Sequence, residues 1–420
     1  MMFTPTETAI MGIYFLTLYF SIFWLLVMFE KEEPRGRKEL KRNPMFTVII
    51  PAWNEERNII GTVESAAKLD YPKDKMEIIV VNDGSTDSTR RIVEEHIRTH
   101  KGLPKVKLVN QENQGKGSAL NTGLREAKGE FFACLDADSS VEPDALKIML
   151  PLFDSEEVGS VCPMMKIKNP RNLVQRMQWY EYIINFFYKK LNAKLDCVHV
   201  TPGPFSIYRT KVIKDLGGYD EDNITEDLEI AMRLQKHNYK IIQTLDATVY
   251  TLAPDNLKAL FRQRDRWYKG SVYNTLKYKE LMFNRKYGDF GMIRMPTILV
   301  SGILAIAIFA LLLKTTTGYL YKGIANLAAV NFDLLTIINN MALHIDLLSI
   351  NFTAAAVFLF VITLGLFVLV YSHRAVGEKI FNHSKAFVSL SFYMLAYSFF
   401  ITLVWIAIAF ELAIGKKQRW

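Results

Sequence analysis

The sequence predicts an α/β domain with a mostly parallel sheet, set between α-helical transmembrane segments. Hydrophobic residues make up 50% of the 420 residues, although 22% are charged, and one uniform domain does not explain that combination. Apolar residues concentrate in a few long charge-free stretches, whereas the segment after the first stretch alternates strand-like and helix-like patterns. The three cysteines lack C-x-x-C spacing, which argues against a disulfide framework or a cysteine zinc site.

Four stretches are apolar enough to cross a membrane. About 20 apolar helical residues span a hydrocarbon core of roughly 30 Å, so we predict transmembrane helices at residues 9–29, 295–313, 352–371 and 386–410. A fifth stretch, 323–350, contains Asp333 and Asp346; it crosses the membrane, re-enters it or lies along its surface. The first stretch lacks the basic start and cleavage site of a signal peptide, so we expect an uncleaved anchor.

The charges beside these stretches predict their orientation. Residues 30–42 contain six basic and four acidic side chains, and only Glu7 precedes the first stretch. The positive-inside rule then places the large insert in the cytoplasm of a multi-pass protein of the cell membrane. At the C-terminus the charges disagree, because basic residues after 410 favour a further crossing while those at 374–385 oppose it. The side of the C-terminus therefore stays open.

The insert begins with alternating strands and helices. Apolar and β-branched runs predict strands at 46–50, 76–81, 105–109 and 131–135, with helix-compatible segments between them at 56–69, 88–100 and 117–128. Strand, helix and strand at this spacing favour a parallel sheet covered on both faces. Ligands of such sheets bind at the carboxyl ends of the strands.

Three of these strands end in polar residues: Pro51-Ala-Trp-Asn-Glu-Glu56, Asn82-Asp-Gly-Ser-Thr-Asp87 and Asp136-Ala-Asp138. Taken singly, each is explained as turn chemistry, but three at one sheet edge would converge in space. Paired aspartates at a strand end suit a hard divalent cation, Mg²⁺ or Mn²⁺, which would neutralise a diphosphate leaving group. Lys116, before a helix start, either adds positive charge there or is a solvated surface lysine. No strand is followed by a P-loop or G-x-G-x-x-G motif.

Two further clusters follow. Thr225-Glu-Asp227 opens an amphipathic helix, where an N-cap threonine and first-turn acids would by themselves explain the placement. Gln263, Arg266 and Trp267 share one face of a predicted helix at 257–267. An amide, a guanidinium and an indole suit a phosphate and a flat sugar ring, although arginine and tryptophan also favour membrane boundaries. The basic stretch 255–289 favours contact with anionic headgroups or a diphosphate rather than with nucleic acid.

The ordered motifs PAWNEE, NDGS, DAD, TED and QxxRW together resemble those of the family 2 glycosyltransferases. The resemblance is to the membrane-embedded, processive branch, which includes cellulose, hyaluronan and poly-N-acetylglucosamine synthases. It covers about residues 43–267 and the flanking helices. It is nearest to the poly-N-acetylglucosamine synthase type through Gly203-Pro-Phe-Ser-Ile-Tyr-Arg209, the TED motif and Gln263-Arg-Asp-Arg-Trp267. The resemblance implies a GT-A fold and an inverting transfer from a nucleotide-activated sugar, a UDP-sugar.

The resemblance also implies a role for each motif residue. Asp227 would be the general base, with Glu226 beside it, while Thr225 and Trp267 would contact the acceptor. Asp138 and Asp136 would bind the Mg²⁺ or Mn²⁺ ion, with Asp138 the more direct ligand. The nucleotide-sugar would be bound by eight residues: Ala52, Asn54, Glu55, Asp83, Lys116, Asp136, Gln263 and Arg266.

These expectations divide the chain into an anchor and linker (1–42), a GT-A catalytic domain (43–254), basic interfacial helices (255–294) and a C-terminal transmembrane region (295–420).

The leading hypothesis is extension of a β-linked polysaccharide coupled to export. No gating-loop motif follows Trp267, and few spans follow it, so a homo-oligomer or an accessory export subunit would complete a channel. An alternative is transfer of one sugar to a lipid carrier or glycolipid. A transporter or receptor with a degenerate domain is a third hypothesis, which the intact carboxylates oppose.

Overall fold

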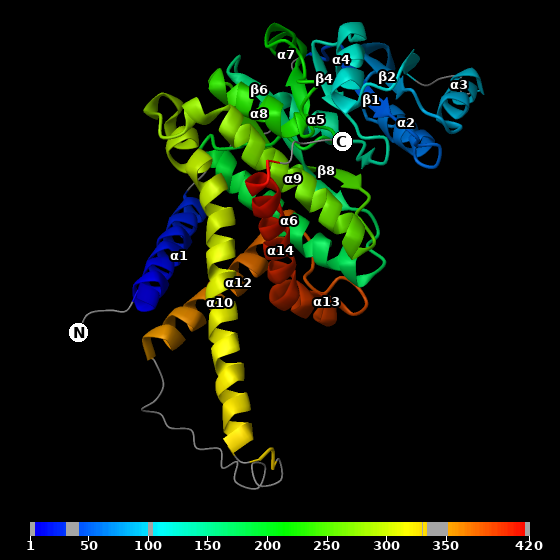
Figure 1. Cartoon of the computed structure of the whole chain (residues 1–420). Coiled ribbons are helices and arrows are strands. Elements are labelled where there is room, and N and C mark those ends of the chain that lie inside the picture. The colour runs from blue at the N-terminus through cyan, green and yellow to red at the C-terminus, as the bar shows by residue number, and fades with distance from the viewer. Residues whose placement is uncertain (1–4, 31–41, 100–103, 330, 334–351, 416–420) are drawn as a thin grey trace.

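The computed structural model describes residues 5–30, 42–99, 104–329, 331–333 and 352–415. An α/β domain lies at one end of the molecule, and long helices project from it (Figure 1). The helix α10 extends furthest from the domain, and α1 and α12 project from the same side (Figure 1). This arrangement confirms the predicted combination of an α/β domain with apolar helices.

An eight-stranded sheet organises the domain, in the order β3-β2-β1-β4-β7-β6-β8-β5. The first four strands of that order are parallel, β7 runs antiparallel to both its neighbours, and β6 and β8 are parallel. The strands are β1 (Phe46–Ala52), β2 (Met76–Asp83), β3 (Lys105–Gln111), β4 (Phe131–Cys134), β5 (Ser140–Val141), β6 (Val158–Ile167), β7 (Ile207–Arg209) and β8 (Lys240–Thr251). The four predicted strands and the mostly parallel sheet are confirmed, whereas β5 to β8 were not predicted.

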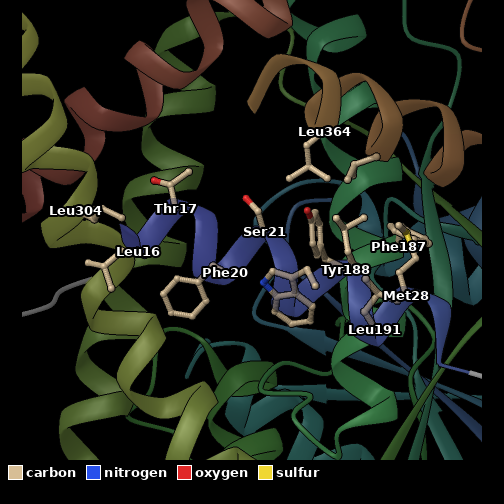
Figure 2. A pocket seen from close by; sticks show the side chains of 13 residues that line it. Leu16, Thr17, Phe20, Ser21, Met28, Phe187, Tyr188, Leu191, Leu304 and Leu364 are labelled. Carbon is tan, nitrogen blue, oxygen red and sulfur yellow. The ribbon is translucent and has the colours of Figure 1, made fainter. Parts of the chain in front are cut away.

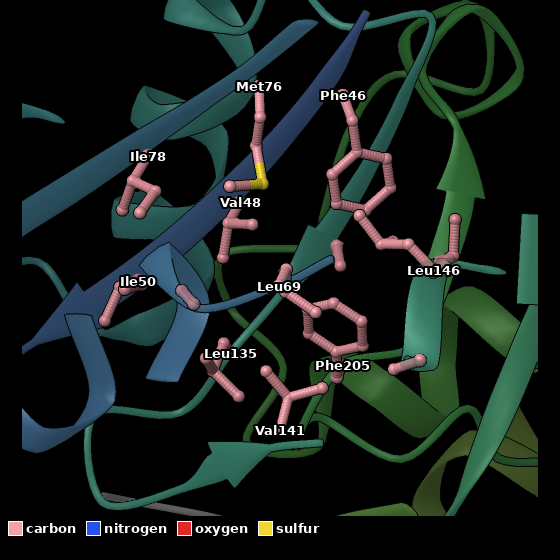
Figure 3. Packing of buried hydrophobic residues seen from close by; sticks show 14 of the residues in the cluster. Phe46, Val48, Ile50, Leu69, Met76, Ile78, Leu135, Val141, Leu146 and Phe205 are labelled. Atoms are coloured by element: carbon pink, nitrogen blue, oxygen red, sulfur yellow. The ribbon is translucent and has the colours of Figure 1, made fainter. Parts of the chain in front are cut away.

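Side chains of the central strands alternate between two apolar layers, as the two-residue period of a strand requires. In β1, Phe46, Val48 and Ile50 face the cluster that Figure 3 shows, and Ile49 faces the other layer. The helices of the domain are α2 (Ile59–Ala67), α3 (Thr89–Thr99), α4 (Lys116–Glu126), α5 (Ala145–Met149), α6 (Leu173–Lys194), α7 (Thr210–Asp215), α8 (Glu226–Lys236) and α9 (Leu257–Lys277). The helices predicted between the first four strands correspond to α2, α3 and α4.

The packing of α4 on the sheet is unusually close. A Cβ on Gly123 would lie 2.3 Å from the Cγ2 atom of Ile49, so only glycine allows α4 to approach β1 this closely. The residue at the start of α4 is Lys116, one of the candidate site residues. The tight packing therefore fixes the position from which the Lys116 side chain begins.

Four helices are long and apolar enough to cross a membrane, among the residues that the structure describes: Met11–Phe29, Phe290–Ala329, Ala355–Val376 and Ala386–Ala413. They correspond to the four predicted spans. The elements that form them are α1 (Pro5–Phe29), a π-helical turn (Phe290–Arg294) leading into α10 (Met295–Ala329), α12 (Phe352–Val376), and α13 (Ala386–Phe392) joined through a π-helical turn (Tyr393–Tyr397) to α14 (Ser398–Ala413). Short 3-10 turns occur at Lys73–Lys75, Leu150–Leu152, Lys279–Leu281 and Arg285–Tyr287.

The second span is longer than predicted, because α10 continues to Ala329. The start of the ambiguous stretch 323–350 therefore belongs to this helix. Most of that stretch, including Asp346, lies outside the described residues.

A buried charged network joins the domain to the last membrane span. The guanidinium of Arg264 in α9 is fully buried and forms an ion pair with Glu181 in α6. The same carboxylate accepts a hydrogen bond of 2.7 Å from the hydroxyl of Tyr397. Removing one partner of a buried pair leaves an unpaired charge, which costs far more than the pair itself contributes.

This network generates a stability prediction. We expect Glu181→Ala to destabilise the folded protein by about 3 kcal/mol, because Arg264 would keep a buried charge without a counter-ion. The measurement is the thermal unfolding temperature of the full chain in detergent. The control is Asp70→Ala, which removes an ion pair between Lys147 and Asp70 whose side chains are more than half exposed; we expect little change there. Equal unfolding temperatures for both variants would contradict the prediction.

Candidate active site

One lysine joins two of the motifs, DAD and TED, at the carboxyl edge of the sheet. The Nζ atom of Lys116 lies 2.7 Å from Oδ1 of Asp136 and 2.9 Å from Oε1 of Glu226. Burial disfavours the charged amine, but the carboxylates of Asp136, Glu226 and Asp227 hold the pKa of Lys116 well above its usual value. Lys116 is therefore a fixed positive charge inside a carboxylate cluster, and not a solvated surface lysine.

The loop before Lys116 is held by Asp83 at the end of β2. The two carboxylate oxygens of Asp83 accept hydrogen bonds of 3.0 Å from the backbone N–H of Gln114 and 2.9 Å from that of Gly115, and one of them also accepts a bond from the Gln111 amide. Gly115 adopts a φ of 90°, which favours glycine. Asp83 thus shapes the site by positioning Lys116, a role that its motif alone did not reveal.

The residues after β1 form the neighbouring wall. Ala52 is buried at the strand end. Asn54 has a φ of 55°, and its Oδ1 accepts hydrogen bonds of 2.8 Å from the Thr86 N–H and 3.2 Å from the Thr86 hydroxyl. Glu55 accepts a 2.9 Å bond from the Asn58 amide, and its charge acts on Asp138. Asn54 therefore ties the loop after β2 to the end of β1.

The two aspartates after β4 sit in a tight turn, in which the Ser139 N–H donates 2.9 Å to the carbonyl of Asp136. Burial, followed by the charge of Asp136, raises the pKa of Asp138 to about 6. A neighbouring cation would favour the ionised form. Among the described residues no group of three or more His, Cys, Asp or Glu gathers to hold a metal ion. The pair suits Mg²⁺ or Mn²⁺, which take much of their coordination from waters and substrate phosphates.

The loop that contains Gly203, the first residue of the Gly203–Arg209 motif, covers this cluster. A Cβ on Gly203 would lie 3.1 Å from both the Oδ2 of Asp136 and the Nζ of Lys116. The same loop reaches α8, because the Thr201 hydroxyl donates a 2.8 Å hydrogen bond to the carbonyl of Asp227. The loop therefore links the aspartates after β4 to the first turn of α8.

Asp227 lies half-buried in that first turn. Burial and the charge of Glu226 raise its pKa to about 6, while Lys116, Arg266 and Lys189 oppose the rise. A carboxylate with this pKa is ionised at neutral pH and is a stronger base than an ordinary aspartate. Asp227 is thus suited to accept a proton from a hydroxyl group.

Thr225 stands at the N-cap position of α8, but its side chain makes no capping hydrogen bond, which corrects the capping interpretation. Its hydroxyl is buried and accepts a 3.0 Å hydrogen bond from the Asn274 amide of α9. A Cβ on Gly270 would lie 2.3 Å from the Thr225 hydroxyl oxygen. Thr225, which the resemblance assigns to the acceptor, therefore holds the start of α8, which carries Asp227, against α9.

Within the QxxRW motif, Arg266 lies near Asp227, whereas Gln263 and Trp267 contact Arg264. Arg266 donates a 3.3 Å hydrogen bond to the carbonyl of Ile224 and acts electrostatically on Asp227. Gln263 accepts a hydrogen bond from Arg264, whose guanidinium stacks 4.3 Å from the centre of the Trp267 ring. Arg264 was missed by the sequence analysis, because a buried arginine and a solvated one look alike in a basic helix.

Comparison with known proteins shows the family and the fold of this chain. The family model described as glycosyl transferase family 2 matches residues 47–217. The chain is 31% identical over 287 residues to a poly-β-1,6-N-acetyl-D-glucosamine synthase of Staphylococcus epidermidis, covering 64% of this chain and 68% of that protein. It is 33% identical over 282 residues to the probable glycosyltransferase YdaM of Bacillus subtilis, covering 66% and 67%.

A solved structure shares the fold over nearly the whole chain. It is the mannosyltransferase PcManGT from Pyrobaculum calidifontis in complex with GDP-Man and Mn²⁺, with a TM-score of 0.61, 22% identity and 98% of each chain covered. At that identity the likeness concerns the GT-A fold alone. With its GT-A sheet, its carboxylate-lined edge and these relatives, the chain belongs to glycosyltransferase family 2 and is a glycosyltransferase.

Proposed function

We propose that this enzyme transfers a sugar with inversion from a UDP-sugar to the growing end of a β-linked polysaccharide. The observation that carries the proposal is the contact of Lys116 with both Asp136 and Glu226, because it brings a candidate metal-binding aspartate close to the turn that carries the candidate base, Asp227. The relatives named poly-β-1,6-N-acetyl-D-glucosamine synthase support a polysaccharide product. The mannosyltransferase complex with GDP-Man supports a nucleotide-sugar donor.

The reaction is a single displacement at the anomeric carbon. The acceptor hydroxyl oxygen forms the new bond to that carbon, and the bond from the carbon to the diphosphate oxygen breaks. The hydroxyl proton passes to the carboxylate of Asp227. A pKa of about 6 leaves this group ionised at pH 7 while keeping it basic enough to take the proton.

The departing diphosphate needs positive charge, and the site supplies it from two elements. Lys116 begins α4 and Arg266 projects from α9, and both act on the carboxylate of Asp227. Asp138 and Asp136 would hold Mg²⁺ or Mn²⁺, which when bound would neutralise diphosphate charge. Ala52, Asn54, Glu55 and Asp83 would form the nucleoside side, with Gln263 and Trp267 toward the acceptor.

The placement of the site relative to the membrane belongs to the same proposal. The positive-inside rule places the α/β domain in the cytoplasm, where nucleotide sugars are made. The product would then have to cross the membrane. A homo-oligomer or an accessory subunit would complete an export path beside the four candidate spans of the described residues.

A donor screen tests the proposal. Purified full-length protein is incubated with Mg²⁺ or Mn²⁺ and each nucleotide sugar in turn, while nucleotide release and product length are measured. We expect one UDP-sugar to be consumed and a product of many sugars. A product with a single added sugar would replace the polysaccharide assignment by transfer to a lipid carrier or glycolipid. Absence of transfer from every donor would reject the proposal.

The base assignment predicts the effect of Asp227→Asn. We expect transfer to fall by about 10²- to 10⁴-fold, the usual contribution of a general base, while affinity for the nucleotide is retained. The measurements are the rate of sugar transfer and nucleotide binding by calorimetry. The matched control is Asp222→Asn, an exposed residue of the loop that precedes α8, which should behave as the wild type. Transfer by the Asp227 variant near the wild-type rate would disprove the assignment.

The close contact between α9 and Thr225 predicts a second effect. Gly270→Ala would push the Thr225 loop, and Asp227 with it, away from its position. Displacement of a reacting group by about 1 Å costs on the order of 10²-fold in rate, so we expect a loss of that size in kcat. Gly61→Ala in α2 meets nothing within 4 Å and serves as the control. Equal rates for the two alanine variants would show that the contact does not position the base.

A further inference from the structure

A group of basic side chains lies where α10 begins. Arg294, the last residue before α10, contacts the imidazole of His199 at 3.2 Å and 2.9 Å. Lys189 projects from α6, and its charge acts on His199 and on Asp227. All three side chains are half-buried. We call Lys189, His199 and Arg294 the basic cluster.

The chain on both sides of the cluster is tied to the candidate base. Thr201, two residues after His199, donates through its hydroxyl a 2.8 Å hydrogen bond to the carbonyl of Asp227. Met295, next to Arg294, packs in one apolar cluster with Leu228, next to Asp227. The loop that carries His199 is also held by α8, because the Gln235 amide donates to the carbonyls at positions 196 and 198. The basic cluster is therefore adjacent to the acceptor side of the reaction.

The positive charges of the basic cluster are not neutralised by ion pairs within the described residues. In the part of the chain that the structure describes, no carboxylate forms an ion pair with Lys189 or Arg294, and the carboxylate that acts on Lys189 is that of Asp227. A neutral imidazole has one acceptor nitrogen, so His199 can accept only one hydrogen bond from the guanidinium. Burying cations without a counter-ion is costly, which indicates a site shaped for an anion.

The donor diphosphate is not the anion that fits this site best. At the donor end, the cation in contact with Asp136 is Lys116, at 2.7 Å. Lys189 instead acts on Asp227, the residue that faces the attacking hydroxyl in the proposed reaction. The anion held by the basic cluster would therefore belong to the acceptor.

The membrane side of the same helices has room for an apolar chain. A cavity of about 270 Å³ lies between α1, α6, α10 and α12 (Figure 2). Its lining is largely apolar and includes Phe187 and Leu191 of α6 and Leu304 of α10. Leu304 follows Arg294 by ten residues, about 15 Å along a helix. A phosphate at Arg294 with a lipid chain beside α10 would match both features.

We propose that Lys189, His199 and Arg294 bind the phosphate of a lipid-linked acceptor beside Asp227, with the lipid chain among the membrane helices. This inference rests on the proposed function and adds the chemical class of the acceptor on which the glycan is begun. Charged hydrogen bonds from Arg294 and Lys189 would hold the phosphate, and His199 would orient the guanidinium.

The test is binding of a radiolabelled polyprenyl phosphate to the full-length protein in neutral detergent. The unphosphorylated polyprenol of equal length and inorganic phosphate are the competitors, and UDP binding is measured in parallel. We expect Lys189→Gln and Arg294→Gln to raise the Kd for the lipid phosphate about tenfold or more. Lys189→Arg should keep wild-type affinity, as should Lys211→Gln, an exposed control on α7. UDP affinity should be unchanged in all variants.

Three outcomes would overturn the inference: equal affinity of the wild type for polyprenol and polyprenyl phosphate, unchanged lipid binding in both glutamine variants, or competition by inorganic phosphate as strong as that by the lipid. Loss of UDP affinity in the glutamine variants would assign the basic cluster to the donor instead, which also contradicts it. Failure of the proposed function is distinguishable, because a wild-type protein that binds no nucleotide and consumes no donor would reject the function whatever lipid it binds.

Discussion

The site depends on one positive charge placed among carboxylates that would otherwise repel one another. Asp136, Glu226 and Asp227 come from two separate elements, and burial makes their mutual repulsion strong. Lys116 lies within 2.9 Å of two of them and acts electrostatically on the third. Its position is secured by Asp83, which holds the preceding loop, and by the close packing of α4 on β1. The cluster therefore depends on the sheet beneath it.

A second constraint ties the site to the membrane helices. Gly270 of α9 lies against Thr225. Arg264 of the same helix forms an ion pair with Glu181 inside the protein. Glu181 in turn accepts a hydrogen bond from Tyr397 in the last candidate span. Arg266 and Trp267 are thus positioned by a helix that contacts both the catalytic turn and the membrane region.

Residue periodicity and polar strand ends predicted the first half of the α/β domain, from β1 to β4. The four strands from β1 to β4 and the helices between them follow from residue periodicity, and the polar strand ends converge because parallel strands share a carboxyl edge. Contacts between residues far apart in the sequence could not be predicted from periodicity. That Asp83 serves the loop before Lys116, that Gly203 covers Asp136, and that Arg264 is buried all depend on contacts between residues far apart in sequence. The long strands β6 and β8 and the helix α6 carry weak periodicity and were not predicted.

The most direct test of the role of Lys116 is the pH dependence of kcat/KM, which reports the ionisation of the free enzyme. In the wild type we expect activity to fall below about pH 6, as Asp227 takes up a proton. Because the charge of Lys116 lowers the pKa of Asp227, Lys116→Gln should move this acid limb to higher pH, in addition to lowering the rate. An acid limb at the same pH in both proteins would contradict the claim that Lys116 sets the electrostatics of the site.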